Sequence, residues 1–173
     1  MVKVLICGDV NSNFEILLNR ISTLQNSAHG PFQVLFFSGK LFRDAAEFDQ
    51  IAPTLTFPMK AYSFDRTGVT DGVLSEESQL EFFNASGVGL ATVANLTVGF
   101  MRSDADPESV QDAKYISNLV GYRGCDLLFT DDWPRETHHF LEDADRNILL
   151  ETGVGLGIGL QEFSSFSTAI RPR

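Results

Sequence analysis

Polar side chains follow several of the apolar segments that are predicted as strands, and their types could hold a metal ion. Asp9 and Asn11 follow the first such segment, Lys40 the second, Asp65 the third and Asp131 a later one. Ligands in an open α/β sheet bind at the carboxyl ends of the strands, so we expect these side chains to share one edge of the sheet. Carboxylate and amide oxygens there could hold one divalent cation that activates water for phosphodiester hydrolysis.

Lys40 argues against a two-metal centre at this edge. An ammonium group about 4 Å from a divalent cation is repelled by roughly 8 kcal/mol at an effective dielectric constant of about 20. One alternative is that Lys40 pairs with Asp9, so that an internal ion pair replaces the metals. A second alternative, one weakly held metal at Asp9, Asn11 and Asp131, stays open.

The order of the predicted elements in the first part of the chain indicates an α/β fold with a mixed, mostly parallel sheet flanked by helices. Strands are expected over Val2–Cys7, Phe32–Ser38 and Met59–Phe64. The first helix between them is expected to start after a cap at Asn13 or Ser12. The second helix is expected to span Asp44–Ile51. The apolar run of the first strand is typical of a strand covered on both faces, so helices are expected on both faces of the sheet.

The second part of the chain contains further short elements. Leu80–Phe83 is expected to be a short helix or strand, and Asp126–Thr130 a buried strand. Val88–Val93 and Leu96–Arg102 are expected to form a hairpin that turns at Ala94-Asn95. With no internal repeat and no linker, residues 1–173 are expected to form a single domain, the amino-terminal part of a longer chain.

Composition excludes several classes of protein. The 173 residues include 13 Lys and Arg against 23 Asp and Glu, a net charge of −10, which disfavours a general binder of nucleic-acid backbones. A hydrophobic fraction of 43% with 21% charged residues is ordinary for a globular protein. The two cysteines, Cys7 and Cys125, are expected to be free thiols in a reducing, intracellular compartment. No membrane span and no leader are expected.

The strand ends resemble the motifs of calcineurin-like metallophosphoesterases, whose strands deliver GDxH, GDxxD, GNH and later histidines to two metals. Asp9 matches the first aspartate, whereas Asn11 stands at that motif's histidine. Lys40 replaces the aspartate that normally bridges both metals. Asp65 lies near the third motif without its asparagine-histidine pair, and Asp131 follows the strand where the family places a histidine. The resemblance implies a metallophosphoesterase-type sandwich with a degenerate metal site.

Three longer segments occur in the order KVLICGDVNSNFEILLNRISTLQ, GPFQVLFFSGKLF and GCDLLFTDDWP. Together they resemble the amino-terminal domain of the CwfJ family, which reads CGDVxGxF, FDxLxCVGxFF and VDxLLTSxWPxG. This family comprises the Cwf-nineteen-like splicing factors and includes the debranching-enzyme-associated ribonuclease. The final segment, FSSFSTAIRPR, resembles the stretch before the family's next histidine-bearing strand, so the resemblance covers nearly the whole chain. The departures are Ser12 at a usual glycine and Lys40 at a usually uncharged position.

The resemblance implies a non-catalytic protein-interaction module, without a bound metal or cofactor, in spliceosome function and intron-lariat turnover. Its implied partners are spliceosome components and the lariat debranching enzyme, with RNA contacted at most indirectly, and its implied location is the nucleus. The contact surface is expected to use loop residues beside the degenerate site, namely Phe14, Phe42, Arg43, Trp133, Pro134 and Arg135. Packing of Trp133 over the sheet edge is an equal alternative to an interface role.

Two other functions remain open on the sequence. One is a divergent single-metal phosphodiesterase, acting on RNA or nucleotides, that uses Asp9, Asn11, Asp65 and Asp131. The other is a sensor that binds a phosphate group at Lys40 and at the backbone amides that follow Gly8.

Overall fold

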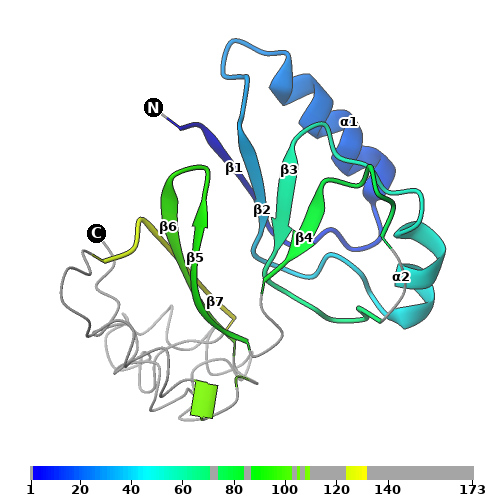
Figure 1. Cartoon of the computed structure of the whole chain (residues 1–173). Helices are drawn as coiled ribbons and strands as arrows, with labels where there is room; N and C mark the ends of the chain where they lie inside the picture. Colours follow the sequence, from blue (N-terminus) through cyan, green and yellow to red (C-terminus); the bar gives the residue numbers. More distant parts are fainter. Residues whose placement is uncertain are drawn as a thin grey trace, which may run out of the picture. The chain divides into compact units, whose positions relative to one another are not determined.

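The computed structural model describes residues 2–70, 74–83, 87–102, 105, 108–109 and 124–131. Its elements are labelled in Figure 1 and run in the order β1 (Val4–Cys7), α1 (Phe14–Gln25), β2 (Val34–Phe37), α2 (Ala45–Ile51), β3 (Lys60–Ser63), β4 (Leu80–Phe82), β5 (Val88–Val93), β6 (Leu96–Met101) and β7 (Leu127–Thr130). The chain divides into two compact units, Met1–Ala85 and Ser86–Arg173. The expectation of a single domain stays a prediction.

The first unit is built on a four-stranded sheet in the order β1-β2-β3-β4, in which every neighbouring pair is parallel. The three strands expected in this part of the chain are therefore confirmed, and Leu80–Phe82 is a strand rather than a helix. All four residues of β2 are buried, as its continuous apolar run predicts. The carboxyl ends of β1, β2 and β3 lie at one edge of this sheet, where the candidate site residues were expected.

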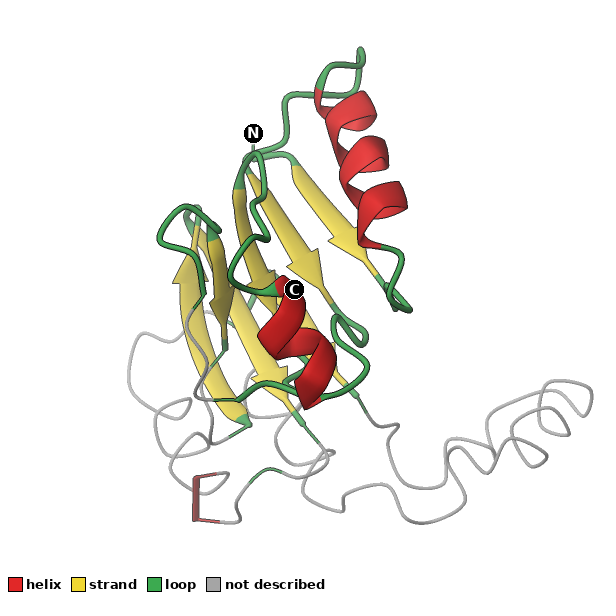
Figure 2. Cartoon of the chain, turned by 90° about the vertical axis from the view of Figure 1, so that its right-hand side faces the viewer, coloured by secondary structure: helices red, strands yellow, loops and turns green. Residues whose placement is uncertain are grey.

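Both described helices pack on the same face of this sheet, and the expectation of helices on both faces is wrong for the first unit. One core cluster joins Phe14 and Ile21 of α1 and Phe48 of α2 to Leu35 and Phe37 of β2. Figure 2 shows α1 and α2 in front of the sheet. The reason is topological: the strands follow one another in one direction, and right-handed crossovers then bring every helix to one side.

β1 is an edge strand of this four-stranded sheet and is not covered on both faces as expected. Its Ile6 side chain is 52% exposed, whereas Leu5 and Cys7 pack against the core under the helices. The apolar run of β1 predicted a strand covered on both faces. Residues of the strand alone cannot show whether a second layer of structure covers its outer face.

α2, which covers most of the predicted span Asp44–Ile51, begins with a side-chain cap at Asp44. The Asp44 carboxylate accepts a hydrogen bond from the Glu47 N–H at 2.9 Å, and the Glu47 carboxylate accepts one from the Arg43 N–H at 2.6 Å. This reciprocal arrangement satisfies backbone donors at the first turn. It also holds the loop that carries Lys40 to Arg43 against the start of the helix.

The second unit contains a three-stranded sheet in the order β5-β6-β7. β5 and β6 form the predicted antiparallel hairpin, and the turn residues Ala94 and Asn95 have φ values of 50° and 65°. β7 pairs with β6 in parallel, which confirms the strand expected there. In the part of the chain that the structure describes, no helix has the length and apolar character needed to cross a membrane.

Candidate functional site

Two loops at the carboxyl ends of β1 and β2 are fastened together around Asp9. The Lys40 N–H donates to Asp9 Oδ1 at 2.7 Å, and the Val10 N–H donates to the Lys40 carbonyl at 2.9 Å. Gly39 permits this approach, since a Cβ atom there would lie 2.6 Å from the Asp9 nitrogen and 2.9 Å from the Gly8 carbonyl carbon. The structure therefore brings Asp9, Asn11 and Lys40 together, as the strand ends predict.

The contact between Lys40 and Asp9 differs from the expected ion pair. It is made by the backbone N–H of Lys40 and not by its ammonium group. Over the described ranges, the ion pairs are Arg43 with Asp44 at 2.9 Å and Lys60 with Glu81 at 2.7 Å. The Lys40 side chain is exposed and stays available for a partner from outside the protein.

The β1–α1 loop makes a left-handed turn at Asn11 and Ser12, whose φ values are 51° and 64°. Ser12 thus adopts a conformation that favours glycine, at the position where the CwfJ-like pattern has glycine. The Asn13 side chain donates to the carbonyls of Val10 and Asn11, at 3.3 and 2.9 Å, and holds the turn. Asn13 occupies the N-cap position of α1 as predicted, but its side chain makes no capping hydrogen bond.

The other expected site residues have different surroundings. Both carboxylate oxygens of Asp65 accept hydrogen bonds from Thr67, one from its hydroxyl at 2.8 Å and one from its N–H at 3.1 Å. Asp131 is exposed and directly follows β7 in the second unit. Among the residues with described positions, no three His, Cys, Asp or Glu side chains form a group that could hold a metal ion.

Two of the residues expected at an interface belong to the core. Phe14 and Phe42 are 7% and 1% exposed, and their ring centroids lie 5.4 Å apart. Phe42 also meets Phe48 edge-on at 5.0 Å. These burials remove both phenylalanines from the expected contact surface and leave Arg43 as its exposed member in the first unit. Trp133, Pro134 and Arg135 lie outside the described residues.

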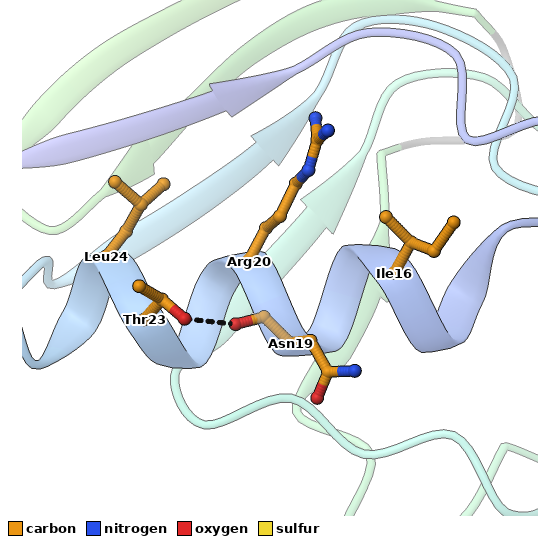
Figure 3. A pocket seen from close by; sticks show the side chains of 5 residues that line it. All are labelled: Ile16, Asn19, Arg20, Thr23 and Leu24. Carbon is orange, nitrogen blue, oxygen red and sulfur yellow. Dashed lines mark hydrogen bonds between the residues drawn. The ribbon is translucent and has the colours of Figure 1, made fainter.

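A surface that the sequence analysis did not identify lies along α1. A cavity of about 470 Å³ is lined by Ile16, Asn19, Arg20, Thr23 and Leu24, which Figure 3 shows along the helix. A second cavity of about 370 Å³ shares Ile16 and Arg20 and reaches Cys7 and Asp9. We name the residues Ile16, Arg20 and Leu24 the α1 stripe, since their i, i+4 spacing places them on one face.

The α1 stripe is apolar at its ends and charged in its centre. Ile16 is 53% exposed and Leu24 is 37% exposed, and Arg20 is exposed between them. The core side of α1 is supplied by Phe14, Leu17, Leu18 and Ile21, and Leu24 does not belong to it. The sequence feature that could have indicated this exposed surface is Ile16, an apolar residue that lies outside the core-facing set.

Cys7 is a half-buried thiol beside Asp9, whereas Cys125 is fully buried. Burial raises the pKa of the Cys7 thiol, and the negative charge of Asp9 raises this pKa further. A raised pKa lowers the thiolate fraction of Cys7 at neutral pH and so lowers its reactivity.

We expect the alkylation rate of Cys7 to rise with pH through a midpoint above the ordinary thiol pKa of about 8.5. The substitution Asp9→Asn should move this midpoint downward, because it removes one of the two causes of the raised pKa. Iodoacetamide labelling followed by mass spectrometry measures the profile, with Cys7→Ser as the control for residual labelling of Cys125. A midpoint that stays or rises in Asp9→Asn would contradict the effect of the carboxylate.

The comparisons with known proteins give a consistent group of relatives. No family model matches the chain. CWF19-like protein 1 homolog from Caenorhabditis elegans is 30% identical over 151 residues, which cover 78% of this chain and 28% of the relative. CWF19-like protein 1 from Homo sapiens is 24% identical over 197 residues, which cover 99% of this chain and 35% of the relative. The chain thus spans about a third of the length of these relatives, and they support a CWF19-like family.

Proposed function

We propose that this CWF19-like chain is a non-catalytic protein-interaction module of the RNA-processing machinery, active in splicing and intron-lariat turnover. Its relatives named CWF19-like protein 1 support the RNA-processing assignment. The resemblance to a metallophosphoesterase-like domain with degenerate ligands supports the non-catalytic mode.

The observation that carries the proposal is the role of Asp9. This is the residue that matches a metal ligand of the phosphoesterase motifs, and its Oδ1 atom accepts the Lys40 N–H in the contact that joins the two loops. The loop position that would supply a bridging carboxylate carries the Lys40 side chain instead. An ammonium group there repels divalent cations and does not ligate them. In this proposal Asp9 therefore has a structural role: it joins the two loops by a hydrogen bond.

The proposed contact residues of the module are the α1 stripe and Arg43 in the first unit, together with Trp133, Pro134 and Arg135, which the sequence analysis expects at the interface. Exposed apolar residues around a central arginine are typical of protein interfaces, where arginine and large apolar side chains supply much of the binding energy. The two cavities beside Ile16 and Arg20 offer recesses for side chains of a partner.

The proposed partners are spliceosome components and the lariat debranching enzyme, and the proposed location is the nucleus. The net charge of −10 disfavours direct binding to an RNA backbone, so RNA is reached through these partners.

Co-precipitation with the purified debranching enzyme and with purified spliceosome proteins tests the proposal. We expect the double substitution Ile16→Ser, Leu24→Ser and the single substitution Arg20→Ala each to weaken the retained complex by about tenfold or more, as for interface anchors. Glu15→Ser is the matched control, because Glu15 is exposed on the same helix but does not line either cavity. Circular dichroism of each variant checks that it is folded.

Two results would overturn the proposal. One is the retention of none of these proteins by the unmodified chain. The other is manganese-dependent hydrolysis of a phosphodiester that is lost in Asp9→Ala, which would establish the single-metal phosphodiesterase instead.

A further inference from the structure

A third cavity, of about 460 Å³, lies between the two fastened loops and is lined by Asn11, Ser12, Lys40, Phe42 and Arg43. Its volume is within the range of roughly 300–1,000 Å³ that is usual for small-molecule sites. Among the described residues that line it, Lys40 and Arg43 are cationic, in a chain whose net charge is −10. Asp9 lines the neighbouring cavity and not this one.

The cationic groups at this cavity have hydrogen-bonding capacity to offer. The Nε atom of Arg43 donates to Asp44, and within the described part of the chain its two terminal nitrogens have no protein partner. The Lys40 ammonium likewise has no hydrogen bond or ion pair to any described residue, although the backbone of Lys40 is held by Asp9 and Val10. The anchored loop therefore carries an ammonium group without a partner among the described residues and a guanidinium group whose Nε is paired with Asp44 while its terminal nitrogens stay unused.

The β1–α1 loop, which supplies Asn11 and Ser12 to the lining of this cavity, adds neutral hydrogen-bond donors. Among the described residues, no acceptor takes the N–H groups of Asn11 and Ser12, which lie in the left-handed turn. Three carboxylates near the cations already accept hydrogen bonds: Asp9 from the Lys40 N–H, Asp44 from Arg43 and the Glu47 N–H, and the buried Glu47 from the Arg43 N–H. Cationic side chains and backbone N–H groups of residues that line one cavity match the oxygens of a phosphate group.

We propose that this cavity binds the terminal phosphate of a small phosphomonoester such as a mononucleotide. Phe42 lines the cavity but is 1% exposed, so it offers no face on which a base could stack. The site thus recognises the phosphate group and discriminates little between bases. This inference concerns ligand binding and is distinct from the protein-interaction role, which uses the α1 stripe and shares only Arg43 with this cavity.

Isothermal titration of the intact chain in chloride buffer with inorganic phosphate, AMP, CMP and adenosine tests the site. We expect AMP and CMP to bind with affinities within a few-fold of each other, inorganic phosphate to compete with them, and adenosine not to bind. Lys40→Gln and Arg43→Gln should each weaken AMP binding by about tenfold or more, as expected for charge-assisted hydrogen bonds. Lys40→Arg should retain binding within a few-fold.

Lys60→Gln is the matched control, because it removes one positive charge from an exposed position that lines none of the three cavities. Equal affinity for AMP in the unmodified chain and in both glutamine variants would overturn the proposal. So would equal binding of adenosine and AMP, or an oligoribonucleotide that binds far more tightly than AMP, since the latter indicates a strand-binding surface. If the unmodified chain bound AMP but retained none of the proposed partner proteins, only the interaction role would be contradicted.

Discussion

Replacing Phe42 by alanine is expected to lower the free energy of unfolding by about 3–5 kcal/mol, the range for a buried phenylalanine. Phe42 is 1% exposed and contacts Phe14 and Phe48, with ring centroids at 5.4 and 5.0 Å. Its removal therefore leaves a cavity between α1 and α2 that neighbouring rings fill only in part. Urea denaturation, followed by circular dichroism, measures the loss as a lower midpoint at an unchanged slope.

The neighbouring residue supplies the control for this experiment. Arg43 is exposed, and the hydrogen bond that it makes to Glu47 uses its backbone N–H, so Arg43→Ala should leave the unfolding midpoint nearly unchanged. If Phe42→Ala instead left stability intact and weakened only partner binding, Phe42 would be an interface residue, and its place in the core would be wrong.

The second large effect is expected at Gly39, where substitution by alanine should destabilise the protein by about 1–3 kcal/mol or more. The added Cβ atom would overlap the Asp9 carboxylate and would lie 2.6 Å from the Asp9 nitrogen. Because backbone atoms of the other loop are involved, a change of side-chain rotamer cannot relieve the clash. The two loops must separate, which breaks the hydrogen bond from the Lys40 N–H to Asp9.

Gly8→Ala is the matched control, at the other glycine of these two loops. A Cβ atom at Gly8 meets nothing within 4 Å, and Gly8 does not have a positive φ. We therefore expect no loss of stability, or a gain of about 0.4–1 kcal/mol from the reduced entropy of the unfolded chain. Equal destabilisation by both substitutions, in urea titrations run side by side, would contradict the close packing of the loops at Gly39.

Local pattern was sufficient to predict much of this fold. The apolar run Val34–Phe37 predicts a buried strand, and Ala94-Asn95 between two alternating segments predicts a hairpin turn. Both follow from interactions between residues close in sequence, namely side-chain alternation and turn geometry. The meeting of Asp9 and Lys40 was also predictable, because parallel strands carry their carboxyl ends to one edge.

Long-range packing determined the features that the sequence analysis missed. A phenylalanine at a loop or helix start, such as Phe14 or Phe42, has the same local pattern whether it faces solvent or the core. Its burial depends on where α1 and α2 lie, and both cover one face of the sheet. For the same reason the apolar residues Ile16 and Leu24 are exposed, since Ile21 and its neighbours already fill the core side of α1.

The sequence by itself determined which residue types meet at the site, and the tertiary structure determined which atoms they use. Lys40 and Asp9 suggested an ion pair. The loops lie so close together at Gly39 that the backbone N–H of Lys40, and not its ammonium group, makes the hydrogen bond to the Asp9 carboxylate. The Lys40 ammonium group then has no partner among the described residues, and Lys40 lines the cavity between the two loops together with Arg43. Sequence spacing cannot predict this difference, because whether a backbone or a side-chain group makes a contact depends on the three-dimensional separation of the two chain segments.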